Sequence, residues 1–133
     1  MTRTTVAVVR PPPALLDLEE SVRRATGHIT EAAREGAALV VFPETWLTGY
    51  PAWAFGLAGR RDRTAQRRHA RLLERSPVLG HEGGDDDLAP VRAAARESGV
   101  TVVLGLNERA GKASGSLPRL CGSSPRTRPW DRS

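Results

Sequence analysis

One glutamate with aromatic neighbours offers the clearest chemistry in this sequence. Glu44 ends the apolar run of GAALVVFPETWLTGYP, with Phe42 before it and Trp46, Tyr50 and Trp53 after it. A carboxylic acid that aromatic side chains shield from water has a raised pKa, closer to the range useful to a general base. The pattern therefore favours proton transfer by Glu44.

A structural role for Glu44 is equally compatible with these residues. A carboxylate just past a strand can also cap backbone amides or pair with an arginine. Gly49 and Pro51 indicate a tight turn that would fix the angle of Tyr50 in either case. The residues alone leave both roles open.

The segments around Glu44 have the order of a βαβ unit. Residues 4–9 are rich in β-branched side chains and end before three prolines, which indicates a strand followed by a forced turn. Residues 38–42 are apolar on both faces of a pleat, as in the middle of a parallel sheet. Ligand chemistry in such sheets collects at the carboxyl ends of the strands, and Glu44 follows such an end.

The helix between these strands is marked at both ends. Asp17 and Glu20 have the spacing of a capping box, and Gly36 stands where a helix end favours positive φ. An apolar stripe recurs at steps of four and three: Leu18, Val22, Ala25, Ile29 and Ala32. Both signals predict a helix with one buried face.

Two further helices and a strand complete the predicted α/β fold. Helices are expected over 62–75 and 88–98, and a buried strand over 100–106. Three aspartates at 85–87 precede the second of these helices, where negative charge is favourable. Consecutive carboxylates point apart, so we expect no metal site there.

Composition excludes several classes of protein. The 133 residues allow one domain at most. The net charge of +5 invites a nucleic-acid reading, but the basic run at 60–75 has no aromatic residue for base stacking and fits a solvated helix face. A single cysteine, Cys121, permits no internal disulfide and fits a cytoplasmic protein. No apolar run approaches the ~20 residues of a membrane span.

The character of the chain changes near residue 110. Residues 110–133 have no hydrophobic period and are dominated by Gly, Ser, Pro and Arg. We expect residues 4–109 to form the organised part and 110–133 to be disordered. Such a tail is what a GC-rich gene encodes when it is read out of frame, and a genuinely truncated paralogue is the alternative.

The stretch around Glu44 resembles the glutamate signature of the nitrilase, or carbon-nitrogen hydrolase, superfamily. In that signature a glycine precedes an apolar strand, the catalytic glutamate, and then Gly-Tyr-Pro. The matching positions are Gly36, Leu39, Val40, Phe42, Glu44, Leu47, Gly49, Tyr50 and Pro51. FPETWLTGYPAW and the later LNER are similar to the nitrilase branch, and Arg10 departs from it where Gln is expected.

The resemblance implies part of an α-β-β-α sandwich and a Cys-Glu-Lys site that hydrolyses a nitrile to a carboxylic acid and ammonia. In that chemistry a cysteine thiolate forms a thioimidate, a glutamate is the general base, and a lysine stabilises the tetrahedral species. Glu44 takes the place of the base, with Tyr50 and Trp53 as substrate contacts. No cofactor or metal is implied. The full-length family implies a small nitrile substrate and a homo-oligomer, with no nucleic-acid or membrane partner.

The other catalytic residues of the resemblance have no counterpart. Lys112 is too close to LNER, Cys121 lacks the neighbours of the nucleophile, and Glu108 is better explained by a salt bridge than as the second glutamate. We therefore expect this chain to be an inactive N-terminal fragment. The alternative from another class is a small α/β binding module without chemistry.

Overall fold

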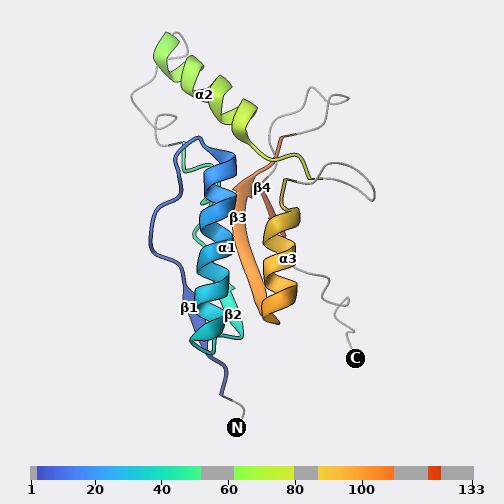
Figure 1. The fold of residues 1–133 in the computed structure, drawn as a ribbon. Helices are drawn as coiled ribbons and strands as arrows, with labels where there is room; N and C mark the ends of the chain where they lie inside the picture. The colour runs from blue at the N-terminus through green and yellow to red at the C-terminus, as the bar shows by residue number, and fades with distance from the viewer. Residues whose placement is uncertain (1–2, 52–61, 80–86, 110–119, 124–133) are drawn as a thin grey trace, which may run out of the picture.

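The computed structural model describes residues 3–51, 62–79, 87–109 and 120–123 (Figure 1). Its elements are β1 (Val6–Val8), α1 (Leu18–Arg34), β2 (Leu39–Val41), α2 (Arg63–Arg75), α3 (Ala89–Ser98), β3 (Thr101–Asn107) and β4 (Leu120–Ser123).

The four strands form one sheet in the order β1-β2-β3-β4. β1, β2 and β3 are parallel, and their register places Val40 opposite both Ala7 and Val102. Two βα crossovers connect these strands, since α1 lies between β1 and β2 and both α2 and α3 lie between β2 and β3. The predicted α/β class and the predicted parallel neighbours are confirmed.

The two faces of the sheet differ in their cover. α1 and α3 lie side by side against one face (Figure 1), and the side chains that alternate toward them are buried, among them Val40, Val102 and Leu104. The other face, which we call the open face, carries Val8 and Val103 at 65% and 44% exposure. Within the described residues, no helix covers the open face.

The ends of α1 agree with the sequence signals. The Asp17 side chain accepts a hydrogen bond from the Glu20 N–H at 3.1 Å, and Gly36, just beyond the C-cap, has φ +86°. Only half of the capping box forms, because the Glu20 carboxylate pairs with arginines while the Asp17 N–H donates to the Ala14 carbonyl. The predicted apolar stripe is buried in the core except for Leu18, which is partly buried.

The other two helices also begin and end near the predicted residues. Asp62 caps α2 by accepting from two backbone amides, and Gly99 ends α3 with φ +67°. α2 extends away from the sheet (Figure 1), and Leu72 is its one buried residue, which fits a solvated basic face. No helix in the described part of the chain is long and apolar enough to cross a membrane.

A short strand appears where the sequence indicated no element. β4 pairs antiparallel with the end of β3, with Cys121 opposite Leu106. Four residues are too few to show a period, so pattern reading could not find this strand. The rest of the predicted tail, 110–119 and 124–133, lies outside the described residues, and its predicted disorder stays a prediction.

Candidate functional site

Glu44 stands on a turn that interrupts the β2–β3 ladder. The Phe42 N–H donates to the Val103 carbonyl at 2.8 Å, as expected for parallel strands. If β2 simply continued, the next hydrogen bond of the ladder would run from the N–H of residue 44 to the Gly105 carbonyl. The N–H of Leu47 takes that place instead, at 3.3 Å. Glu44 is therefore part of an excursion, closed by the bond from the Trp46 N–H to the Pro43 carbonyl at 3.3 Å.

The excursion lies over Gly105 on the open side of the sheet. A Cβ on Gly105 would stand 2.8 Å from the Glu44 Cα. Gly105 and Val103 are two residues apart in β3, so this missing side chain belongs to the open face. Glu44 is thus presented on the face that α1 and α3 leave uncovered.

The carboxylate of Glu44 is accessible and unpaired. Glu44 is exposed, and among the described residues no group donates a hydrogen bond to its side chain or forms an ion pair with it. The structural role left open by the sequence, a backbone cap or an arginine partner, is thus absent from this part of the chain. The shielding from water that its aromatic neighbours suggested is absent as well.

Two of those aromatic neighbours belong to the core. Phe42 and Trp46 are each 3% exposed, and their rings meet edge-on at a centroid distance of 4.8 Å. Trp46 also packs edge-on against His28 of α1, on the covered side of the sheet. The interpretation of Phe42 and Trp46 as walls around Glu44 is therefore wrong. Both side chains pack into the core on the covered face of the sheet and hold the turn from there.

Thr45, the residue after Glu44, is held in an unusual state. It has φ +51°, which is uncommon for a β-branched residue, and it is 3% exposed. Its Oγ1 is buried with no hydrogen-bond partner among the described residues. Such backbone strain and an unsatisfied hydroxyl each cost free energy and persist only where the surroundings enforce them.

A second loop fastens the Glu44 turn from the side of β1. The Trp46 Nε1–H donates to the Pro11 carbonyl at 2.9 Å, and the Leu16 N–H donates to the Thr48 carbonyl at 3.2 Å. Thr48 is fully buried, and its hydroxyl accepts from the Asn107 side chain at 3.3 Å. The residues after Glu44 are therefore tied to both β3 and the loop before α1.

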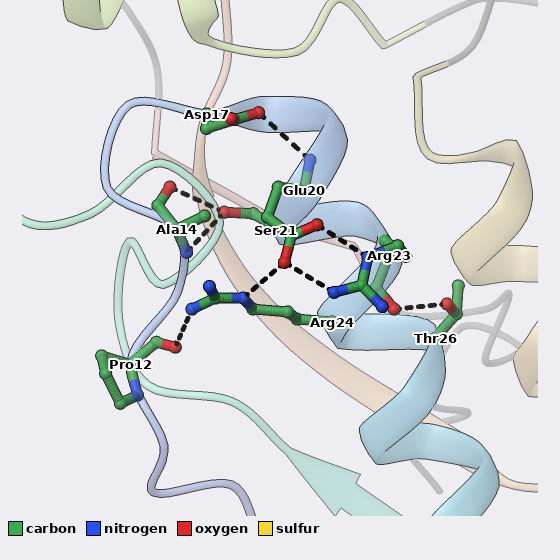
Figure 2. A network of polar contacts seen from close by, with 8 residues as sticks. All are labelled: Pro12, Ala14, Asp17, Glu20, Ser21, Arg23, Arg24 and Thr26. Atoms are coloured by element: carbon green, nitrogen blue, oxygen red, sulfur yellow. Dashed lines mark hydrogen bonds and ion pairs between the residues drawn. The ribbon is translucent and has the colours of Figure 1, made fainter.

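That loop is itself held by the first turns of α1, as Figure 2 shows. The buried Ser21 hydroxyl donates to the Ala14 carbonyl at 2.9 Å and accepts from the Ala14 N–H at 3.1 Å. Arg24 reaches the Pro12 carbonyl at 3.5 Å and the Glu20 carboxylate at 2.9 Å. The start of α1 thus supports the segment on which the Glu44 turn rests.

Glu20 is the titratable group most changed by this network. Hydrogen bonds from Arg23 and then from Arg24 lower its pKa from 4.5 to about 2, and the same pairing raises the pKa of Arg23. The ion pairs of Glu20 are exposed and lie at the start of α1, so they belong to the support of the loop and not to the chemistry at Glu44.

The other residues considered from the sequence are Tyr50, Trp53, Lys112, Cys121 and Glu108. Tyr50 is 48% exposed and follows the turn, while Trp53 and Lys112 lie outside the described residues. Cys121 pairs in register with Leu106, whereas Gly122 pairs with Gly105, the residue beneath Glu44. Glu108 has no ion pair within the described residues, so the salt bridge expected for it is not found there.

A groove of about 430 Å³ lies elsewhere on the molecule. Its lining includes Leu18 and Val22 of α1, Ser76 after α2 and Pro90 of α3. Glu44 does not line it. The groove belongs to the helical side of the fold, so it is separate from the carboxylate on the open face.

Gly105 and Thr45 were not identified from the sequence as site residues. An isolated glycine inside a strand pattern signals a close backbone approach, and Gly105 interrupts VTVVLGL in this way. Nothing in the sequence marks Thr45, because its strain arises from the path of the turn.

Fold and site together define an α/β protein with an accessible carboxylate at the carboxyl end of a central parallel strand. The family model described as carbon-nitrogen hydrolase matches residues 5–123. The chain belongs to this family, in its nitrilase branch. The match passes the expected limit at 109 and takes in β4.

Curated relatives agree with this membership. The chain is 34% identical over 109 residues to an aliphatic nitrilase of Rhodococcus rhodochrous, a match covering 82% of this chain and 27% of the relative. It is 39% identical over 105 residues to an arylacetonitrilase of Fusarium vanettenii, covering 79% and 28%. A cyanide hydratase of Penicillium rubens is 33% identical over 102 residues, covering 77% and 26%. The chain thus spans little more than a quarter of the length of these relatives.

Proposed function

We propose that Glu44 is the general base of a nitrilase-type site that converts a nitrile to a carboxylic acid and ammonia. The observation that carries this proposal is the state of the Glu44 side chain. It is exposed, has no partner among the described residues, and stands on a turn that is fastened on two sides. A carboxylate without partners is free to accept a proton, as a general base requires.

The chemistry assigns Glu44 repeated proton transfers. It accepts the thiol proton of a cysteine, whose thiolate adds to the nitrile carbon, and passes that proton to the nitrile nitrogen to give a thioimidate. It then takes a proton from the water that attacks the thioimidate and passes it to the nitrogen, so that ammonia leaves and a thioester remains. A second water, deprotonated in the same way, hydrolyses the thioester to the acid and regenerates the cysteine. The names of the nitrilase relatives support a nitrile as the substrate class.

We further propose that the 133 residues do not perform this reaction alone. The chain has one lysine, Lys112, and one cysteine, Cys121, and neither has the sequence context of the family's catalytic residues. A base without its nucleophile has no productive proton to accept, and losing the nucleophile alone removes most of the rate.

The resemblance to the family supports a homo-oligomer at full length, and the single cysteine supports a cytoplasmic protein.

Reading the coding DNA beyond codon 109 in all three frames tests whether lysine and cysteine segments of the family follow. Their presence in another frame supports a nitrilase whose frame is lost near residue 110. Their absence from every frame supports the truncated paralogue or the non-catalytic binding module.

The direct test is an ammonia-release assay on the purified chain. Aliphatic and aromatic nitriles are incubated with the wild type and with Glu44→Gln, which keeps the size of the side chain and removes its basicity. We expect no turnover from either protein. Turnover by the wild type that Glu44→Gln loses would contradict the proposed inactivity, and Cys121→Ser would then show whether that thiol is the nucleophile.

A further inference from the structure

Gly105 occupies a position in β3 where a side chain has no space. A Cβ there would lie 2.5 Å from the Pro43 carbonyl oxygen, 2.7 Å from the Thr45 nitrogen and 2.8 Å from the Glu44 Cα. All three are backbone atoms, so none can move away by a change of rotamer. Real Cβ atoms essentially never approach other atoms this closely.

We propose that Gly105 is a positioning residue for Glu44: its missing side chain lets the Glu44 turn lie directly on β3 and so fixes where the carboxylate stands. This inference rests on the proposed function for the role of Glu44. The placement itself follows from the geometry and can be tested without catalysis.

The turn has little freedom to yield to a side chain at 105. The bonds from Phe42 to Val103 and from Leu47 to Gly105 hold it to β3 on both sides of Glu44. Thr45, at φ +51°, already occupies a sparsely populated backbone region. To reach ordinary van der Waals contact, the three backbone atoms would have to rise by roughly 0.6 to 0.9 Å.

A displacement of this size matters for a catalytic carboxylate. Catalytic groups must be held within about 0.5 Å of their productive positions. A misplacement of about 1 Å can lower a rate on the order of 100-fold. Gly105 therefore sets the position of the base without touching the substrate.

Pairing with β4 is a competing reason for a glycine at 105, since Gly105 lies opposite Gly122. The surroundings of the missing Cβ argue against it. The three nearest atoms all belong to Pro43, Glu44 and Thr45, and none belongs to β4. The constraint at Gly105 therefore comes from the Glu44 turn.

The test is nuclear magnetic resonance spectroscopy of the isotope-labelled 133-residue chain. In the wild type we expect a strong nuclear Overhauser effect between the Gly105 Hα that points to the open face and the Thr45 amide. Gly105→Ala should shift the amide signals of residues 43–45 more than those of β1 or α1. Gly27→Ala is the matched control, because a Cβ at Gly27 meets nothing within 4 Å.

A purely structural role for Gly105 predicts another signature. In that case Gly105→Ala would lower the unfolding midpoint, but the amide signals of residues 43–45 would stay at the positions that they have in Gly27→Ala. That result overturns the inference, and so does absence of the Gly105–Thr45 effect in the folded wild type. If Gly105→Ala does not fold, the comparison is repeated in a Thr45→Gly background, where the more permissive backbone allows the turn to rise.

These outcomes are independent of the ammonia assay. Unexpected turnover by the wild type would contradict the proposed inactivity and leave the signals of the turn unchanged. Conversely, a turn that does not respond to Gly105→Ala removes the positioning role and leaves the chemistry proposed for Glu44 intact.

Discussion

Two adjacent valines of β3 give a sharp test of the two-faced sheet. Val102 is 5% exposed and lies on the face covered by α1 and α3, while Val103 is 44% exposed and lies on the open face. Replacing each by alanine removes the same two methyl groups from neighbouring positions of one strand. Differences in β propensity therefore largely cancel, and the comparison isolates burial.

The expected costs follow from how much of each side chain is removed from water. Each buried methyl group contributes about 0.8 kcal/mol, and a cavity in a packed core adds to the loss. Val102→Ala should therefore lower the free energy of unfolding by about 2–3 kcal/mol. Val103→Ala loses about half of the transfer contribution and leaves no enclosed cavity, so we expect about 0.5–1 kcal/mol.

The assay is urea unfolding of the full chain followed by far-ultraviolet circular dichroism at several protein concentrations. Equal costs for the two variants would refute the assignment of an uncovered face. A Val103→Ala cost that grows with protein concentration would show that copies of the chain cover the open face by association, because only then does stability depend on concentration.

Two further predictions concern charge and backbone. Hydrogen bonds from Arg23 and then Arg24 lower the pKa of Glu20 from 4.5 to about 2, so their contribution to stability is fully present above pH 4.5 and is lost as the pH falls through 2. The difference in unfolding free energy between wild type and Glu20→Gln should therefore shrink steadily between these two pH values, and a difference that is as large near pH 2 as at neutral pH would contradict the pairing. Gly99→Ala should lower the free energy of unfolding by about 1 kcal/mol because residue 99 has φ +67°, whereas Gly27→Ala in the open interior of α1 should raise it by about 0.5–1 kcal/mol. Chemical denaturation measures both changes, and equal effects of the two substitutions would contradict the left-handed cap.

Local patterns were sufficient for most of the secondary structure. The alternation of steps from Leu18 to Ala32 and the Asp17 cap located α1, and Gly36 marked its end. The parallel arrangement followed because short βα connections leave few other topologies. These features depend on neighbours in sequence, which a pattern records directly.

The surroundings of Glu44 depend on contacts that no local pattern records. Phe42 and Trp46 are four residues apart around the turn, yet both point into the core beneath α1. The aromatic spacing alone could not distinguish a pocket wall from a core anchor. The open side on which Glu44 stands became visible only with the contact between its backbone and Gly105.

The long crossover between β2 and β3 determines when the site can form during synthesis. Leu39 pairs with Thr101, so β2 and α1 leave the ribosome well before their partner strand exists. Until then one edge of β2 is unpaired, and the Glu44 turn has no Gly105 on which to rest. Parallel pairings of such sequence separation form slowly, because the loop must close before any contact repays it. During synthesis the Glu44 turn can therefore reach this geometry only once β3 is available, and a nascent chain that stops before residue 105 has the glutamate without its supporting strand.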